Sequence, residues 1–184
     1  MFTAAFEEGA MRPSRRVVAA ALMAAGWVSG VGATPSAQAT DDPSAINGRY
    51  VATSDGTYAT TNYAFHNEAT VTSTWTITSI CATEVSCTGQ VSSDQGWSAP
   101  LRTEGHVWYA ERDVPNWETC PDGTSFTGHQ TFMFYPANAN GVTQIGSPYL
   151  EGKDKTVGQR FACGAAKEAR VLTIVMPFHL DKVG

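Results

Sequence analysis

Short β-rich runs separated by turn residues fill the chain from Asn47 onward, and this pattern constrains the fold more than any other feature. The clearest run spans 70–79, where Val71, Trp75 and Ile77 alternate with threonines. Successive side chains of a strand point to opposite faces, so this alternation predicts a half-buried strand with a threonine ladder on its outer face. The chain is therefore expected to be all-β.

The same pattern predicts six further strands. They are expected at 49–54, 86–93, 106–112, 125–135, 142–150 and 171–180. Dipeptides that tolerate the positive φ of tight turns stand beside these runs. They are Asn47-Gly48, Asp55-Gly56, Asp122-Gly123 and Asn140-Gly141. The stretches 58–67 and 165–170 are the candidates for short helices.

About seven to eight strands joined by short connections predict an antiparallel meander. Because an exposed sheet edge promotes aggregation, such a meander closes into a barrel or folds into two packed sheets. The runs follow one another without a long crossover of the Greek-key kind. We therefore predict a small barrel, with a β-sandwich as the alternative.

The amino terminus has the three-part organisation of a secretory signal peptide. Basic residues within 12–16 precede an apolar run over 17–33, and Ala37-Gln38-Ala39 fits the small-x-small motif of signal peptidase. Met11 is the expected start, since the ten residues before it carry two glutamates that suit a basic n-region poorly. This pattern predicts a Sec signal peptide over 1–39.

The mature chain is expected to be one exported domain. Residues 40–46 form a polar leader that we expect to be flexible, and 47–184 form the β domain. The apolar run at the amino terminus is shorter than the roughly 20 residues that cross a bilayer, so the mature chain is expected to have no membrane span. The predicted location is secreted or extracytoplasmic, in the cell envelope or beyond it.

The predicted mature chain is acidic. Loss of 1–39 removes three arginines and two glutamates, which leaves nine basic and fifteen acidic residues. The basic residues are scattered, so the cationic surface that nucleic acids and anionic membranes require is not expected. The four histidines lie in separate segments without ligand spacing, so no metal and no cofactor is expected.

Four cysteines in an exported domain predict two disulfides. Proximity along the chain favours Cys81 with Cys87 and Cys120 with Cys163, although four cysteines allow three pairings. The spacing does not match a zinc site, which needs closely paired thiolates.

Catalytic patterns are weak. Glu111 and Asp113 share one face of a predicted strand and would suit a glycosidase only if a further strand brought a partner to them. A solvated face with Arg112 opposite is the favoured interpretation, because acidic residues are usually exposed. A secreted hydrolase is therefore the least favoured function, and the sequence assigns no catalytic residue.

Aromatic residues give the best indication of a binding site. Trp117 lies in the segment 114–123, where two prolines and a cysteine predict a rigid loop, and Trp97 lies in another predicted loop. Both tryptophans would form a lid if they met at one mouth of the barrel. The residues predicted to line a pocket are Trp97, Trp117, Trp108, Phe132 and Phe134; the alternative is that they fill a closed core.

Six segments of the chain carry a family resemblance: TSDG (53–56), HNEATVTSTWTI (66–77), CTG (87–89), SDQGW (93–97), VPNWETCPDG (114–123) and MPFHL (176–180). With these segments the chain resembles a group of secreted mycobacterial (actinobacterial) proteins of unknown function. The resemblance implies export and an actinobacterial envelope setting, and it provides no catalytic residue. The meander also resembles lipocalin and avidin barrels in outline, without the Gly-x-Trp of a lipocalin's first strand.

These observations favour a secreted, non-enzymatic binding protein that holds a small apolar ligand in a β-barrel. The alternative is a module that presents the loop Pro115–Gly123 to a protein or cell-wall partner. The ligand, the partner and the oligomeric state are not determined by the sequence.

Overall fold

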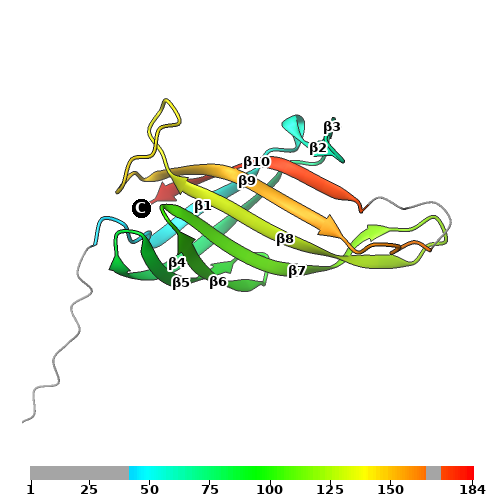
Figure 1. Cartoon of the computed structure of the whole chain (residues 1–184), viewed down its shortest axis with the longest axis horizontal. Coiled ribbons are helices and arrows are strands. Elements are labelled where there is room, and N and C mark those ends of the chain that lie inside the picture. The colour runs from blue at the N-terminus through cyan, green and yellow to red at the C-terminus, as the bar shows by residue number, and fades with distance from the viewer. Residues whose placement is uncertain (1–41, 165–170) are drawn as a thin grey trace, which may run out of the picture. The chain divides into compact units, whose positions relative to one another are not determined.

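The computed structural model describes residues 42–164 and 171–184 and shows a closed barrel of eight antiparallel strands (Figure 1). The strands are β1 (Gly48–Ser54), β4 (Val71–Thr83), β5 (Ser86–Ser93), β6 (Ser98–Glu104), β7 (Val107–Thr119), β8 (Ser125–Pro136), β9 (Tyr149–Gly158) and β10 (Thr173–Val183). From β4 to β10 each strand pairs with the next, and β1 pairs with both β4 and β10. The predicted meander barrel is confirmed, and the sandwich is excluded.

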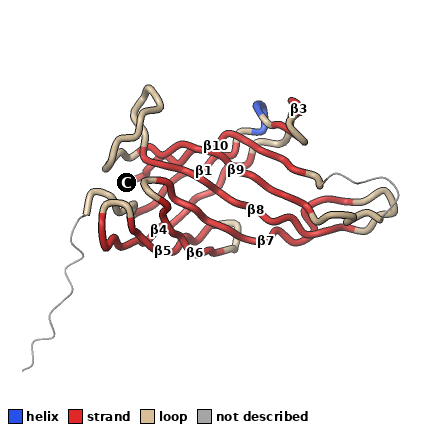
Figure 2. The backbone as a smooth tube through the Cα atoms, in the orientation of Figure 1, coloured by secondary structure: helices blue, strands red, loops and turns tan. Residues whose placement is uncertain are grey.

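A small appendage follows β1. It consists of a 3-10 turn η1 (Gly56–Tyr58) and a short hairpin of β2 (Thr60–Thr61) and β3 (Ala64–Phe65), and β2 pairs with the start of β10 (Figure 2). The helix predicted at 58–67 is therefore wrong beyond this single turn, because Asn62 and Tyr63 take positive φ and reverse the chain instead. The other helical candidate, 165–170, lies outside the described residues, as does the predicted signal peptide.

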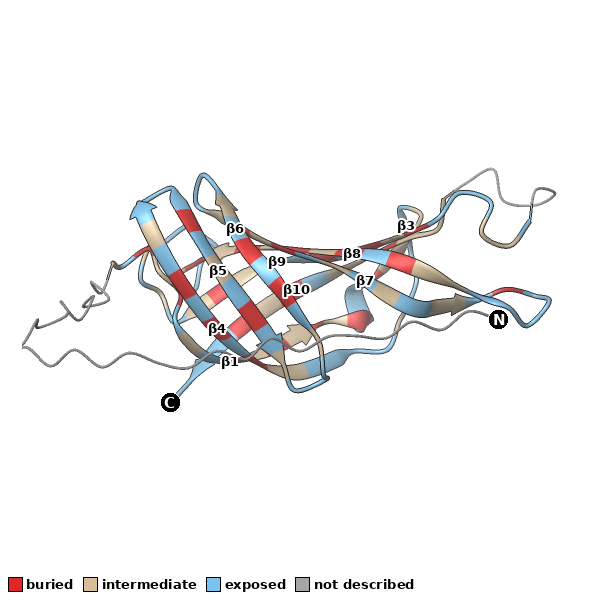
Figure 3. Ribbon diagram, turned by 90° about the horizontal axis from the view of Figure 1, so that it is seen from below, coloured by how far each residue is buried: buried red, intermediate tan, exposed pale blue. Residues whose placement is uncertain are grey.

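Inward and outward residues alternate along the strands, as Figure 3 shows for β4 and β5. In β4 the inward positions Trp75 and Ile77 are buried, while the threonines at 76 and 78 are exposed. The barrel interior is therefore a continuous packed core along most of its length. Its buried members include Tyr50, Trp75, Leu101, Trp108, Phe134, Leu150, Phe178 and Leu180.

Three strands differ from the sequence prediction. β6 is missing from the prediction because Pro100 interrupts its apolar pattern, yet this proline points outward. β7 continues through the segment expected to be a rigid loop, with a bulge between Val114 and Glu118 at which Asn116 takes a positive φ. The strand expected at 142–150 lies further along the chain, as β9, and residues 137–148 form the loop between β8 and β9.

The start of the described chain covers one end of the barrel. Ser44 and Ile46 are buried, and the backbone N–H of Ile46 donates to Ser79 Oγ at 2.9 Å. Asn47 Oδ1 accepts a hydrogen bond from the Ser79 backbone N–H at 2.6 Å. Of the segment expected to be a polar leader, Ile46 therefore joins the core.

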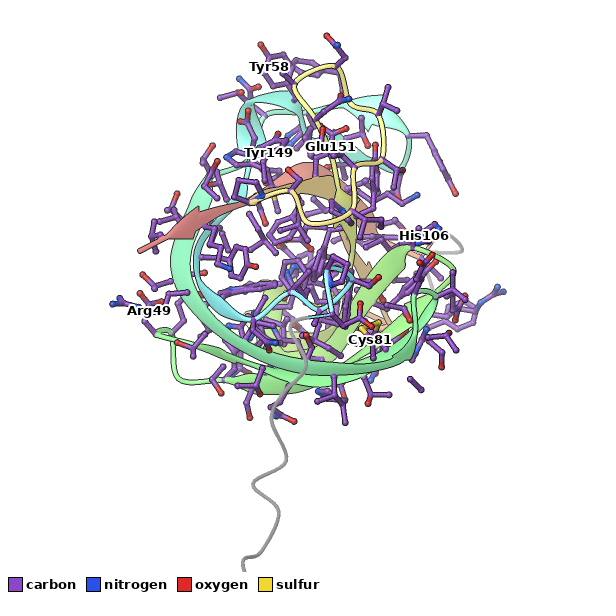
Figure 4. The ribbon with its side chains drawn as sticks, turned by 90° about the vertical axis from the view of Figure 1, so that its left-hand side faces the viewer. Arg49, Tyr58, Cys81, His106, Tyr149 and Glu151 are labelled. Atoms are coloured by element: carbon purple, nitrogen blue, oxygen red, sulfur yellow. A yellow bond between two sulfur atoms is a disulfide. The ribbon has the colours of Figure 1, made fainter. Side chains whose placement is uncertain are left out.

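Both disulfides have the predicted pairing. Cys81–Cys87 closes the β4–β5 hairpin at the covered end of the barrel. Figure 4 shows this end, viewed along the barrel, with Cys81 and His106 labelled. Cys120–Cys163 joins the tip of the long β7–β8 hairpin to the chain after β9. Two disulfides are typical of an oxidising, extracytoplasmic compartment. In the described part of the chain, no helix has the length and apolarity needed to cross a membrane.

Candidate functional site

A cavity of about 240 Å³ opens at the end of the barrel opposite Ile46, where the β7–β8 hairpin extends beyond the other strands (Figure 1). Its wall comes from six of the eight barrel strands, all except β5 and β6, and from the β5–β6 turn. Apolar and polar side chains share this wall. The apolar ones include Val71, Trp75, Trp97, Val114, Trp117, Phe132, Met176 and Phe178, and the polar ones Ser54, Ser73, Gln95, Arg112, Gln130, Asp154 and Thr156.

The floor of the cavity is an aromatic cluster around Trp75. The Trp75 ring meets Phe132 edge-on with the ring centroids 4.8 Å apart, and Phe178 lies 5.2 Å away at a tilt. Trp97 completes the cluster, edge-on to Trp75 at 5.2 Å and stacked on Phe132 at 5.9 Å. These contacts fix each ring in one orientation, so the floor is rigid and apolar.

A buried polar network crosses the same cavity. Asp154, which is 2% exposed, accepts a hydrogen bond from Ser54 Oγ at 2.8 Å. The Gln130 amide donates to both Asp154 oxygens at 2.9 Å. The Gln130 carbonyl oxygen in turn accepts from Arg112 Nε at 2.6 Å. Only this orientation of the Gln130 amide satisfies both neighbours, so the network fixes it.

Burial shapes the electrostatics of the network. Loss of water raises the pKa of Asp154 above its ordinary value, while the hydrogen bonds from Ser54 and Gln130 and the charge of Arg112 oppose this rise. Burial likewise lowers the pKa of Arg112, and the charge of Asp154 opposes that shift. Gln130 stands between the two charged groups and hydrogen-bonds to both of them.

Arg112 also stacks on an aromatic ring. Its guanidinium carbon lies 4.4 Å from the centroid of Trp97, within the range of a cation–π interaction. The stack and the bond to Gln130 hold the guanidinium plane from two sides. The two terminal Nη groups have no hydrogen-bond partner among the described residues.

Trp117 forms the rim of the cavity on the β7–β8 side. It meets Phe126 edge-on at 5.8 Å. Gly128 and Gly158 face each other across β8 and β9, and a Cβ on Gly128 would stand 2.6 Å from the Trp117 ring. These two glycines leave the space that the indole occupies, so Trp117 is held against the barrel rather than presented to solvent.

The structure gathers three of the five aromatic residues predicted for a pocket. Trp97, Trp117 and Phe132 line the cavity, and the first two lie at the same mouth. Trp108 and Phe134 are core residues outside the cavity lining.

Sequence reasoning missed the polar members of the site. The signal available was the parity of β7, which already places Arg112 opposite the exposed Glu111 and Asp113 and therefore on the inward face. Gln130 occupies an inward position in the same way on β8. Asp154 lies on a strand whose inward positions are too polar to show the usual alternation.

The remaining titratable candidates lie on the outer surface. Glu111 pairs with Arg102 at 2.9 Å, and Asp113 pairs with His129 at 3.0 Å, so both carboxylates belong to the solvated face. Within the described ranges, no group of three or more histidines, cysteines and acidic residues is placed to hold a metal ion.

No protein-family model and no curated protein matches the sequence. Among solved structures, the chain is similar to the monomer form of the M. tuberculosis PknI sensor domain. The two share a TM-score of 0.50 at 13% sequence identity, over 76% of this chain and 88% of the sensor domain. At this identity the similarity shows a shared fold and carries no information about individual site residues.

Proposed function

We propose that this protein is a non-enzymatic binding protein of the cell envelope or extracellular space, and that its end cavity holds a small ligand with an apolar body and a polar head. The observation that supports this most is the combination of a rigid aromatic floor with the chain of Arg112, Gln130 and Asp154 in one cavity. Small-molecule sites have this composition: apolar walls and a few polar groups that converge.

Stability alone does not account for the polar network. A buried charged network rarely stabilises a fold more than well-packed apolar residues of similar volume. Here the inward positions Asp154 and Thr156 follow an apolar one, Leu150, on the same strand, so an apolar continuation was available to the fold. Four of the six buried polar residues among those described, Ser54, Gln130, Asp154 and Thr156, line the cavity, which supports a role in recognition.

The fold is compatible with such a role. The similar structure is described as a sensor domain, and a domain that binds a small molecule is the simplest physical form of a sensor. This support is an analogy at the level of the fold.

Native mass spectrometry of the exported, unreduced protein tests the proposal. A discrete extra mass that disappears on denaturation is expected, and Trp117→Ala should reduce its occupancy because it removes the rim. Tyr63→Ala, at a 94% exposed position on the separate β2–β3 hairpin, is the matched control and should retain the ligand. Bare protein, combined with no change in tryptophan fluorescence on adding octanol or octanoate, would overturn the proposal.

The second candidate function is an interaction module that presents the tip of the β7–β8 hairpin. The tip extends beyond the barrel and is fixed by Cys120–Cys163, which favours a rigid contact surface (Figure 1). Trp117 faces the cavity, so the residues offered to a partner would be the exposed ones at Pro121–Gly123. Replacing this tip with alanines would leave the bound mass unchanged and abolish binding to cell-wall material.

A further inference from the structure

We propose that Arg112 makes the end cavity selective for small amphipathic carboxylates, with the carboxylate on the free Nη edge of the guanidinium and the apolar tail on the aromatic floor. This inference rests on the proposed function, since it names the ligand class of the same cavity. Three observations support it: the hydrogen bonding of Arg112, the stacking of Arg112 on Trp97 and the volume of the cavity.

The hydrogen-bonding capacity of Arg112 is mostly unused. A guanidinium has five N–H donors, and within 42–164 and 171–184 Arg112 commits only Nε, to Gln130. The nearest buried carboxylate, Asp154, is reached only through that glutamine. The four remaining N–H bonds lie in the planar fork that binds a carboxylate through two parallel hydrogen bonds.

Arg102 shows what a satisfied guanidinium looks like in the same barrel. It also stacks on an aromatic ring, with its carbon 4.7 Å from the Tyr109 centroid. Its two Nη groups, however, pair with Glu104 and Glu111. The outer-face arginine thus has two carboxylate partners, whereas Arg112, which lines the cavity, has none on its Nη groups among the described residues.

The stacked guanidinium is also preorganised. Trp97 and Gln130 hold its plane, and a carboxylate that binds there loses little side-chain entropy from the protein. Burial lowers the pKa of Arg112, and an anion at the Nη edge would stabilise the charged guanidinium. Asp154 would repel such an anion only weakly, because both of its oxygens accept hydrogen bonds, from Ser54 and Gln130.

The size of the cavity limits the ligand. A volume of about 240 Å³ corresponds to roughly eight water molecules at ~30 Å³ each, so a chain of about eight carbons fits. The apolar lining near the mouth, which includes Val71, Val114 and Met176, suits an alkyl or aromatic tail rather than a sugar.

Binding of three eight-carbon probes tests the inference. Octanoate, octanol and octylammonium are titrated into the mature, disulfide-bonded protein by calorimetry. We expect octanoate to bind at least about 10-fold more tightly than octanol, and octylammonium most weakly, because charge-assisted hydrogen bonds outweigh neutral ones. Arg112→Gln should weaken octanoate about 10- to 100-fold and change octanol less than about threefold.

Matched variants separate the head group from the fold. Arg102→Gln removes the other stacked arginine and should leave all three affinities unchanged. Arg112→Lys keeps the charge without the planar fork, and is expected to retain only part of the preference for octanoate. If a thermal melt shows that Arg112→Gln is unfolded, Arg112→Lys takes its place in the binding test.

The outcomes that overturn the inference are distinct from those that overturn the proposed function. Carboxylate recognition is refuted if octanol and octanoate bind equally well, or if changing Arg112 weakens the binding of neither probe. Either result would still leave a ligand-binding barrel. Preference for octylammonium would assign recognition to Asp154 instead. No binding of any probe, together with bare protein in the mass spectrum, overturns both proposals.

Discussion

Removing the two disulfides separately should destabilise the protein by clearly different amounts. A disulfide restricts the unfolded chain, and the effect grows with the length of the loop that it closes. Cys120 and Cys163 are 43 residues apart in sequence, which corresponds to about 4 kcal/mol in the chain-entropy relation. Cys81 and Cys87 are 6 residues apart, which corresponds to about 2 kcal/mol.

The structure sharpens this difference. Cys81 and Cys87 are register partners in the β4–β5 hairpin, so the short bridge closes a loop that is local in sequence. The longer bridge encloses β8 and β9 and fixes the hairpin tip, where the Cys120 backbone N–H donates to the Thr124 carbonyl at 2.7 Å. Its loss should therefore also loosen the rim of the cavity.

Guanidinium denaturation of the two double alanine variants measures the effect. The free energy of unfolding should fall about twice as far for Cys120→Ala/Cys163→Ala as for Cys81→Ala/Cys87→Ala. The m-value should rise more for the longer loop, because its unfolded chain becomes less compact. Equal losses, or a larger loss for the short bridge, would refute the chain-entropy reasoning for this barrel.

Three further predictions concern inward-facing positions of the strands, at Asp154, Gly152 and Tyr50. Burial raises the pKa of Asp154 in the folded state, so the stability that Asp154 contributes is complete below its unfolded pKa of about 3.9 and is lost as pH rises through its folded pKa. Denaturation curves should therefore show that the difference in unfolding free energy between wild type and Asp154→Asn falls with rising pH across that window. A difference that does not change with pH would contradict this prediction. Gly152→Ala would place a Cβ 1.9 Å from the Met133 carbonyl oxygen and should cost at least about 3 kcal/mol, whereas Gly96→Ala, with open space but a φ of +82°, should cost about 1 kcal/mol in the same assay. Burial raises the pKa of Tyr50 to about 12, so an ultraviolet titration should contain one late-ionising phenol that disappears in Tyr50→Phe; an unchanged curve would exclude it.

The fold could be predicted because its signals are local. Alternation within single strands and turn dipeptides between them define a meander, and Cys81–Cys87 follows from a hairpin that any antiparallel pairing would form. The position of β9 was not predicted, because its inward face carries Gly152, Asp154 and Thr156, which give the strand no apolar periodicity. A strand that contributes to a polar cavity loses the pattern by which strands are recognised.

The site could be predicted only in part, for a related reason. Aromatic residues near turns indicated a mouth, and Trp97 and Trp117 do meet at one. Arg112, Gln130 and Asp154 come from three strands, and their contacts depend on register, which no local pattern specifies. Each of them alone resembles an ordinary polar strand residue.

The barrel divides along its axis into a half that provides stability and a half that provides the cavity. Toward the covered end, the inward residues of β9 and β10 are apolar, as at Leu150 and Leu180, and Ile46 covers them. Toward the open end, the same strands place Asp154 and Met176 at the cavity. Leu180 belongs to the core and does not line the cavity, so substitutions there should alter unfolding without changing ligand preference, whereas substitutions at Arg112 should change ligand preference more than unfolding. A cavity built in this way can change its lining near the mouth without changing the core at the covered end.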